Sequence, residues 1–190
     1  MNLTNPDNIR SLTNQWTGTR DSNGRPLVAD EILKRMESVT TEEAWGVLKS
    51  HGYNHCFASD WIILHPKKIL VGRAVTCRFV PTRIDLNESI DELIKTEGRI
   101  GGQNSWVIDE SIEDDVIVVD LFGKVRDGTF AGDNLATAIM TNTRRGLVVD
   151  GGIRDAQGIL HLNKFNAFVK GYDPSAIADV TLAEDRKSVV

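Results

Sequence analysis

The chain has 190 residues, of which 41% are hydrophobic and 26% charged, a composition typical of a globular protein that folds as one domain. Its 22 basic and 27 acidic residues give a net charge of −5, which argues against sequence-independent binding to nucleic acid, because such binding needs a concentrated basic face. No apolar run approaches the about 20 residues of a membrane-spanning helix, and residues 1–23 lack the apolar segment of a signal peptide. We therefore expect a cytoplasmic protein with neither a nucleic-acid nor a membrane partner.

The residue types that most often bind zinc are few and scattered. Cys56 and Cys77 do not form a CxxC pair, so neither a disulfide framework nor a cysteine zinc site is expected. The four histidines also lack paired-ligand spacing, which favours solvated or helix-capping roles over metal binding.

The N-terminal third predicts an arm followed by two helices. Residues 1–28 are rich in Asn, Thr, Asp and Gly, and we expect them to form an arm that lies on something else and stays loose unless a neighbour holds it. Regular structure is predicted to start at Asp30, where apolar residues follow helical spacing. A second helix is expected to start near Thr40, which forms a capping-box pair with Glu43, and Gly52 is a suitable end for it.

The next segments alternate between strand and helix patterns. Residues 69–80 have the alternation and β-branched content of a strand, and residues 84–97 have helical spacing. Residues 116–121 are continuously apolar, which is typical of a strand covered on both faces.

Residues 132–160 are the most informative part of the sequence. A helix should begin at Asp133 or Asn134 and stop at Gly146, followed by a buried strand over 147–150. Gly151-Gly152 then requires either a tight turn or a close approach of two backbone segments. After the charged residues 154 and 155 we expect a short helix through residue 160. This alternation predicts a layered α/β domain over residues 29–182.

The C-terminal residues 183–190 have the sequence AEDRKSVV. They are too polar to continue the pattern and too short for another element, so we expect a frayed tail.

The first candidate binding site is the helix start Gly132-Asp133-Asn134-Leu135. The free backbone N–H groups at a helix N-terminus are suited to holding a carboxylate or a phosphate. The alternative is that Asp133 only caps the helix, since Asp is a favoured N-cap residue.

The second candidate is the pair Arg154-Asp155, directly after a buried strand. The planar guanidinium of Arg can hold a carboxylate at two points, and the Asp oxygens suit Mg²⁺ or Mn²⁺. A surface ion pair without function is the alternative. Twenty residues separate Asp133 from Arg154, enough for a helix and a strand that return the chain to the same sheet edge. We therefore expect both candidates to face one pocket.

Together these motifs resemble the RraA-like family, which includes 4-hydroxy-4-methyl-2-oxoglutarate aldolases. GDNLATAIM followed by GLVVDGGIRD is similar to the signature of the family, and VGRAVTCRF and DVIVVDLFG fit the same pattern. The resemblance covers about residues 30–182.

The resemblance implies a β/β/α swivelling-type domain that assembles as a homotrimer or a dimer of trimers, with sites between subunits. It implies that the amides of residues 132–135 and Arg154 bind a keto-acid substrate, that Asp155 anchors Mg²⁺ or Mn²⁺ mostly through water, and that Asp133 orients a catalytic water. Arg154 and Asp133 would then be the catalytic residues of a pyruvate-releasing lyase with oxaloacetate decarboxylase side activity.

Two departures from the family accompany the resemblance. The acidic residue that the family has three positions after the Asp is Gly158 here. Members also usually continue for several more strands, one of which supplies an acidic residue to the neighbouring subunit's site, so the resemblance implies a chain shortened at its C-terminus. Two other functions stay open: a non-catalytic regulator that binds a ribonuclease, and a sugar-acid enzyme on the same scaffold.

Overall fold

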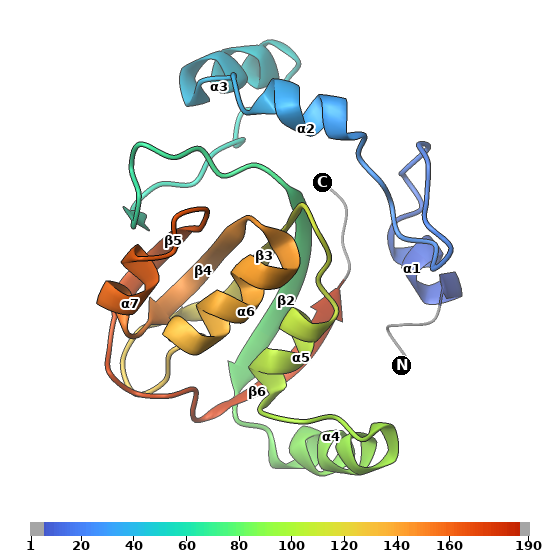
Figure 1. Cartoon of the computed structure of the whole chain (residues 1–190). Coiled ribbons are helices and arrows are strands. Elements are labelled where there is room, and N and C mark those ends of the chain that lie inside the picture. The colour runs from blue at the N-terminus through green and yellow to red at the C-terminus, as the bar shows by residue number, and fades with distance from the viewer. Residues whose placement is uncertain (1–5, 187–190) are drawn as a thin grey trace.

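The structure is a computed structural model that describes residues 6–186 (Figure 1). Its helices are α1 (Pro6–Leu12), α2 (Asp30–Met36), α3 (Thr41–Ser50), α4 (Ile84–Glu97), α5 (Gln103–Asp109), α6 (Asp133–Thr143) and α7 (Ala156–Leu160). Its strands are β1 (Ile62–Ile63), β2 (Arg73–Pro81), β3 (Asp115–Lys124), β4 (Gly146–Ile153), β5 (Asn166–Tyr172) and β6 (Val180–Arg186).

The strands form one six-stranded sheet in the order β1-β5-β4-β3-β2-β6. The four central strands are parallel, and β1 and β6 pair antiparallel at the two edges. Parallel neighbours need a crossover connection, and α6 provides it between β3 and β4. The predicted layered α/β class is confirmed.

The core lies between the sheet and the helices that cover it. In Figure 1, α5 and α6 lie side by side on one face of the sheet, and α7 is next to α6. Ile139 of α6 is fully buried together with the strand residues Ile117 and Val149. Burying each such side chain stabilises the fold by about 1.5–3 kcal/mol, and this packing fixes the loops at the strand ends.

Several predicted elements are confirmed. The α3 capping box forms as expected, with the Thr40 hydroxyl accepting from the Glu43 amide and the Glu43 carboxylate accepting from the Thr40 amide. Helix α4 has the predicted bounds, and the apolar run after Asp115 is a largely buried central strand. Both cysteines are free.

The N-terminal prediction needs a correction, because regular structure begins at Pro6 and not at Asp30. The arm does lie on the rest of the protein: Arg25 Nη2 is 2.5 Å from Asp115 Oδ1 at the start of β3, and both side chains are buried. A long-range ion pair of this kind leaves no local signal in the sequence.

The C-terminal prediction was wrong where it ended regular structure at Leu182. Strand β6 continues to Arg186 and pairs with β2 as far as Thr76. An edge strand needs only backbone partners on one side, and charged side chains are common there. Residues 187–190 of the expected frayed tail lie outside the described residues.

Gly151 and Gly152 do not turn the chain, because both belong to β4. Of the two alternatives, close backbone approach is the one observed. A Cβ on Gly151 would lie 2.7 Å from the Lys124 carbonyl oxygen, and one on Gly152 would lie 2.9 Å from that of Val125. Among residues 6–186, no helix combines the length and the apolar composition needed to cross a bilayer.

Candidate functional site

The helix start at Gly132 and the charged pair after β4 lie side by side at the carboxyl edge of the parallel strands. The Arg154 amide donates to the Ala131 carbonyl oxygen at 3.0 Å, which joins the two loops. A Cβ on Gly132 would be 2.8 Å from Arg154 Nε and would collide with the Asp155 carboxylate. The expected convergence of the two segments is therefore confirmed, while the chemical roles of their residues stay predictions.

Arg154 and Asp155 are neighbours that do not neutralise each other in a tight pair. Arg154 Nε lies 3.5 Å from Asp155 Oδ2, and the side chains are 23% and 49% exposed. Arg154 Nη1 also donates to the Thr129 hydroxyl at 3.4 Å. These long contacts leave donors of the guanidinium and oxygens of the carboxylate accessible to a ligand.

The backbone at Asp155 is strained. Its φ of 55° places a non-glycine residue in the left-handed region, directly before α7. A sparsely populated conformation of this kind costs about 1–3 kcal/mol and persists only where the surrounding structure holds it. Asp155 is held beside Gly132 by strand β4, which precedes it, and by helix α7, which follows it.

Asp133 does not act as the N-cap of α6. The N-cap residue is Gly132, and Asp133 is the first helical residue. Its Oδ1 accepts a hydrogen bond of 2.8 Å from the amide of Asn134. That amide was expected to be free for substrate, and the Asp133 carboxylate occupies it. The side chain of Leu135 packs against the core, so only its backbone faces the helix start.

Gly158 in α7 makes room for Asp133. A Cβ at position 158 would lie 2.8 Å from Asp133 Cβ and 2.9 Å from its Oδ2. The Asp133 carboxylate therefore lies where a side chain at position 158 would begin. This chain has a glycine at the position where related sequences are expected to carry an acid, and another carboxylate lies against it.

A hydrogen-bonded group next to Arg154, formed by Thr129, Asp173 and Ser175, was not predicted from the sequence. The Thr129 side chain is fully buried and donates to the Ser175 carbonyl oxygen at 2.5 Å. The hydroxyl and the amide of Ser175 both donate to the Asp173 carboxylate, and these bonds lower the pKa of Asp173. Burial raises the pKa of the adjacent Tyr172, which pairs with Ile153 in the ladder. No motif marks these residues, because only the pairing of β4 with β5 brings them to this edge.

The oxygen donors at this edge fit a water-rich Mg²⁺ or Mn²⁺ site. Among the side chains that the structure describes, no three of His, Cys, Asp or Glu lie together closely enough to enclose a metal ion. Mg²⁺ does not require such a cage, since it commonly binds one or two carboxylates and keeps several waters. Asp155 supplies an exposed carboxylate beside Gly132, and the Asp133 carboxylate lies against Gly158 of α7, the helix that Asp155 precedes.

The sequence matches the family described as RraA-like (Aldolase/RraA) over residues 27–187. The fold is similar to the crystal structure of RraAS2 from Streptomyces coelicolor, described as an unusual member of the RNase ES inhibitor RraA protein family. The identity is 25% and the TM-score 0.66, with 83% of this chain and 71% of that chain covered. No curated protein is significantly similar to this sequence.

Two further solved structures show the same fold at lower identity. An uncharacterized protein from Pseudomonas syringae pv. tomato str. DC3000 is 21% identical with a TM-score of 0.61, covering 83% of this chain and 66% of that chain. The RNA-processing inhibitor RraA from Thermus thermophilis is 16% identical with a TM-score of 0.53, covering 77% of each chain.

Proposed function

This chain belongs to the RraA-like family, and we propose that it is a divalent-metal-dependent lyase that cleaves 4-hydroxy-2-oxo acids, of the 4-hydroxy-4-methyl-2-oxoglutarate type, to pyruvate. We include oxaloacetate decarboxylation as a side activity, because both reactions place negative charge on the same pyruvate carbon. The observation that carries the proposal is that Arg154 and Asp155 lie so close to Gly132 that a Cβ there would meet both side chains. A helix N-terminus, a guanidinium and a carboxylate at one place suit an anionic, metal-chelating substrate.

In this proposal Arg154 holds the substrate carboxylate. Its guanidinium presents donors in a planar fork, and the Thr129 hydroxyl fixes one arm of that fork. The backbone amides at the start of α6 bind the same carboxylate, assisted by the partial positive charge of the helix N-terminus. The Asn134 amide becomes available only when the Asp133 side chain turns away from it.

Asp155 would hold Mg²⁺ or Mn²⁺, mostly through water. When bound, the cation supplies Lewis-acid stabilisation of the negative charge that develops on the 2-oxo acid as the carbon–carbon bond breaks. Asp133, on the facing helix, would accept a hydrogen bond from a catalytic water and orient it.

A second candidate function is non-catalytic binding and inhibition of a ribonuclease. The similarity to a Streptomyces coelicolor member of the RNase ES inhibitor family favours it. Such a protein would need neither an accessible Arg154 nor an exposed carboxylate beside it, so the exposed Asp155 next to Arg154 supports the lyase.

The test measures pyruvate release from a panel of 4-hydroxy-2-oxo acids with Mg²⁺ or Mn²⁺, and again with EDTA. We expect metal-dependent release that Asp155→Ala abolishes. Asp109→Ala, an exposed carboxylate at the end of α5, is the matched control and should retain activity. Release that persists in EDTA, or an unaffected Asp155→Ala protein, would reject the lyase; ribonuclease inhibition without pyruvate release would establish the second function.

A further inference from the structure

A second polar site lies at the opposite, amino-terminal edge of the parallel strands. A pocket of about 430 Å³ is lined there by residues from the end cap of α2, the segment before β2, the turn before β3, the junction of α6 and β4, and the turn that leads into the start of β5. Its lining residues are Glu37, Lys68, Ile69, Leu70, Asp114, Arg144, Arg145, Lys164 and Asn166. This volume is within the range of about 300–1,000 Å³ typical of small-molecule sites.

The pocket carries an excess of positive charge in an acidic protein. Four of its lining residues are cationic and two are carboxylates, an excess of two positive charges, whereas the whole chain has a net charge of −5. Positive charge gathered in a concave site raises the local concentration of anions. The net charge of this pocket is therefore opposite in sign to that of the whole chain.

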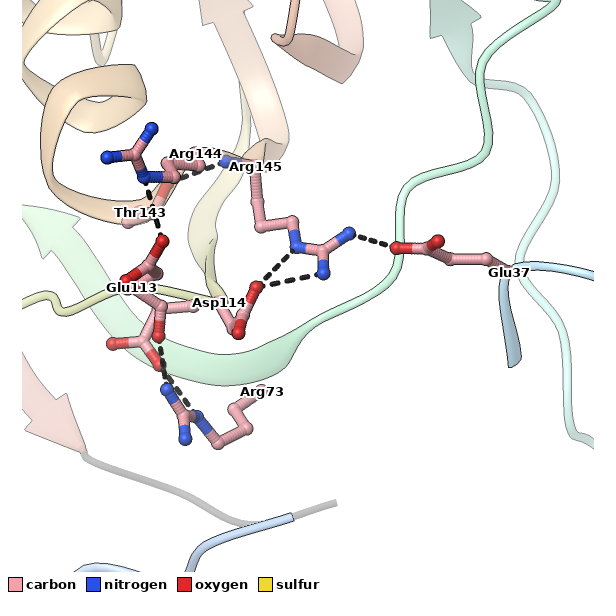
Figure 2. A network of polar contacts seen from close by, with 8 residues as sticks. Glu37, Arg73, Glu113, Asp114, Thr143, Arg144 and Arg145 are labelled. Atoms are coloured by element: carbon pink, nitrogen blue, oxygen red, sulfur yellow. Dashed lines mark hydrogen bonds and ion pairs between the residues drawn. The ribbon is translucent and has the colours of Figure 1, made fainter. Parts of the chain in front are cut away.

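Arg145 is already held by carboxylates of the protein. Figure 2 shows its guanidinium between Asp114 and Glu37, and its Nη2 is 2.8 Å from Asp114 Oδ1. Glu37 follows α2, so a carboxylate from the N-terminal helices occupies one side of this guanidinium. The arginine thus fixes one wall of the pocket.

The other three cations are open to a ligand. The Lys68 ammonium donates to the neutral Asn163 carbonyl oxygen at 2.8 Å, and no ion pair joins Lys164 to any other described residue. Arg144 pairs with Glu113 through Nε only, and these side chains are 60% and 67% exposed. An exposed pair of this kind is worth about 0–1 kcal/mol and exchanges readily for another anion.

The backbone around Lys68 is fixed in advance. The nearly fully buried Asn166 donates from Nδ2 to the Lys68 carbonyl oxygen at 2.8 Å and to that of His65 at 3.2 Å. Its Oδ1 accepts from the His65 amide at 3.0 Å. A ligand would therefore not have to order this segment, which lowers the entropic cost of binding.

We propose that this pocket binds a phosphate monoester through Lys68, Arg144 and Lys164, at a site separate from the one that contains Asp155. A phosphate monoester carries about −1.5 to −2 charges at neutral pH and three acceptor oxygens, which matches the charge excess and the three available cations. Guanidinium and ammonium groups are the usual protein partners of phosphate. The remaining volume accommodates a small organic group beside the phosphate.

The test is calorimetric titration of the full chain with inorganic phosphate and with glycerol 3-phosphate, and with citrate for comparison. We expect saturable binding of both phosphates that Lys164→Gln and Lys68→Gln weaken by about tenfold or more. Lys67→Gln, an exposed neighbour outside the lining, is the matched control and should bind as the unmodified chain does. Glu37→Gln should bind more tightly, because it removes a negative charge from the lining of the pocket.

Absence of saturable phosphate binding would overturn the proposal, as would tighter binding of citrate than of either phosphate. An equal loss in Lys67→Gln would also overturn it, since this would indicate attraction to overall charge. Asp155→Ala should bind phosphate unchanged, which separates this site from the proposed lyase site. Thermal unfolding of each variant shows whether a loss of binding reflects a loss of fold.

Discussion

At the scale of single residues, the candidate site depends on two glycines that let charged side chains come close. Gly132 has no Cβ, and one at that position would collide with Asp155. Gly158 has none either, and the Asp133 carboxylate lies in the space it leaves. Glycine at positions 132 and 158 therefore leaves the space that the Asp155 and Asp133 carboxylates occupy.

Gly158→Ala tests this arrangement. The added methyl group should displace the Asp133 carboxylate, and we expect kcat/KM for pyruvate release to fall by about 10–100-fold, because small misplacements of catalytic groups have effects of this size. The fold should be retained at a small cost in stability, because the new methyl group would also lie 2.8 Å from the Asp133 Cβ and α6 and α7 must shift slightly apart. Gly46→Ala in α3, where a Cβ meets nothing within 4 Å, is the matched control. Unchanged steady-state kinetics in Gly158→Ala would show that the position of Asp133 does not matter.

At the scale of elements, a buried ion cluster joins the N-terminal arm to the sheet. Asp115, at the start of β3, is fully buried and pairs with Arg25 at 2.5 Å and with Arg73 at 3.2 Å. Its second oxygen accepts from the Ile112 amide. A buried carboxylate with these partners is tolerated, whereas a buried arginine without its partner is costly. The cluster therefore couples the arm to β2 and β3.

The substitution Asp115→Asn should release the N-terminal arm from β2 and β3. The amide keeps the shape of the side chain but removes the charge that compensates Arg25, and we expect the free energy of unfolding in urea to fall by about 3–5 kcal/mol. Asp91→Asn, on the exposed surface of α4, should change it little. If both variants unfolded at the same urea concentration as the unmodified chain, the cluster would not be what holds the arm.

At the scale of the whole molecule, α2 and α3 lie apart from the sheet, beyond the amino-terminal ends of its strands (Figure 1). Helix α3 has ten residues and no buried side chain, and its Trp45, Val47 and Leu48 are exposed. Isolated helices shorter than about 12–15 residues are marginal in water. We propose that this surface is covered by another copy of the chain, in the homotrimer or dimer of trimers that the sequence resemblance implies.

Sedimentation velocity at several protein concentrations tests the trimer. We expect the main species to have the mass of three or of six 21.0 kDa chains across the micromolar range. A single-chain mass at every concentration would contradict the proposal. It would not affect the phosphate proposal, which uses residues of one chain.

The sequence alone determined several elements of the domain and their order, although it did not predict α1 or α5. The capping box at Thr40, the bounds of α4, the buried strand β3 and the helix after Gly132 were all predictable, because hydrogen bonds between near neighbours and apolar periodicity are local properties. The meeting of Gly132 with Arg154 was also predictable, since a helix and a strand of known length return the chain to one sheet edge.

Only the tertiary structure decided the contacts that join distant segments. These contacts link residues that are far apart in the chain. They are the hydrogen bond from Thr129 to Ser175, the ion pair of Arg25 with Asp115, the ion pairs of Arg145 with Glu37 and Asp114, and the extension of β6 to Arg186. Each depends on which strands pair and in which register. Strand pairing and register are determined by the packing of the whole core, so they cannot be predicted from a short stretch of sequence.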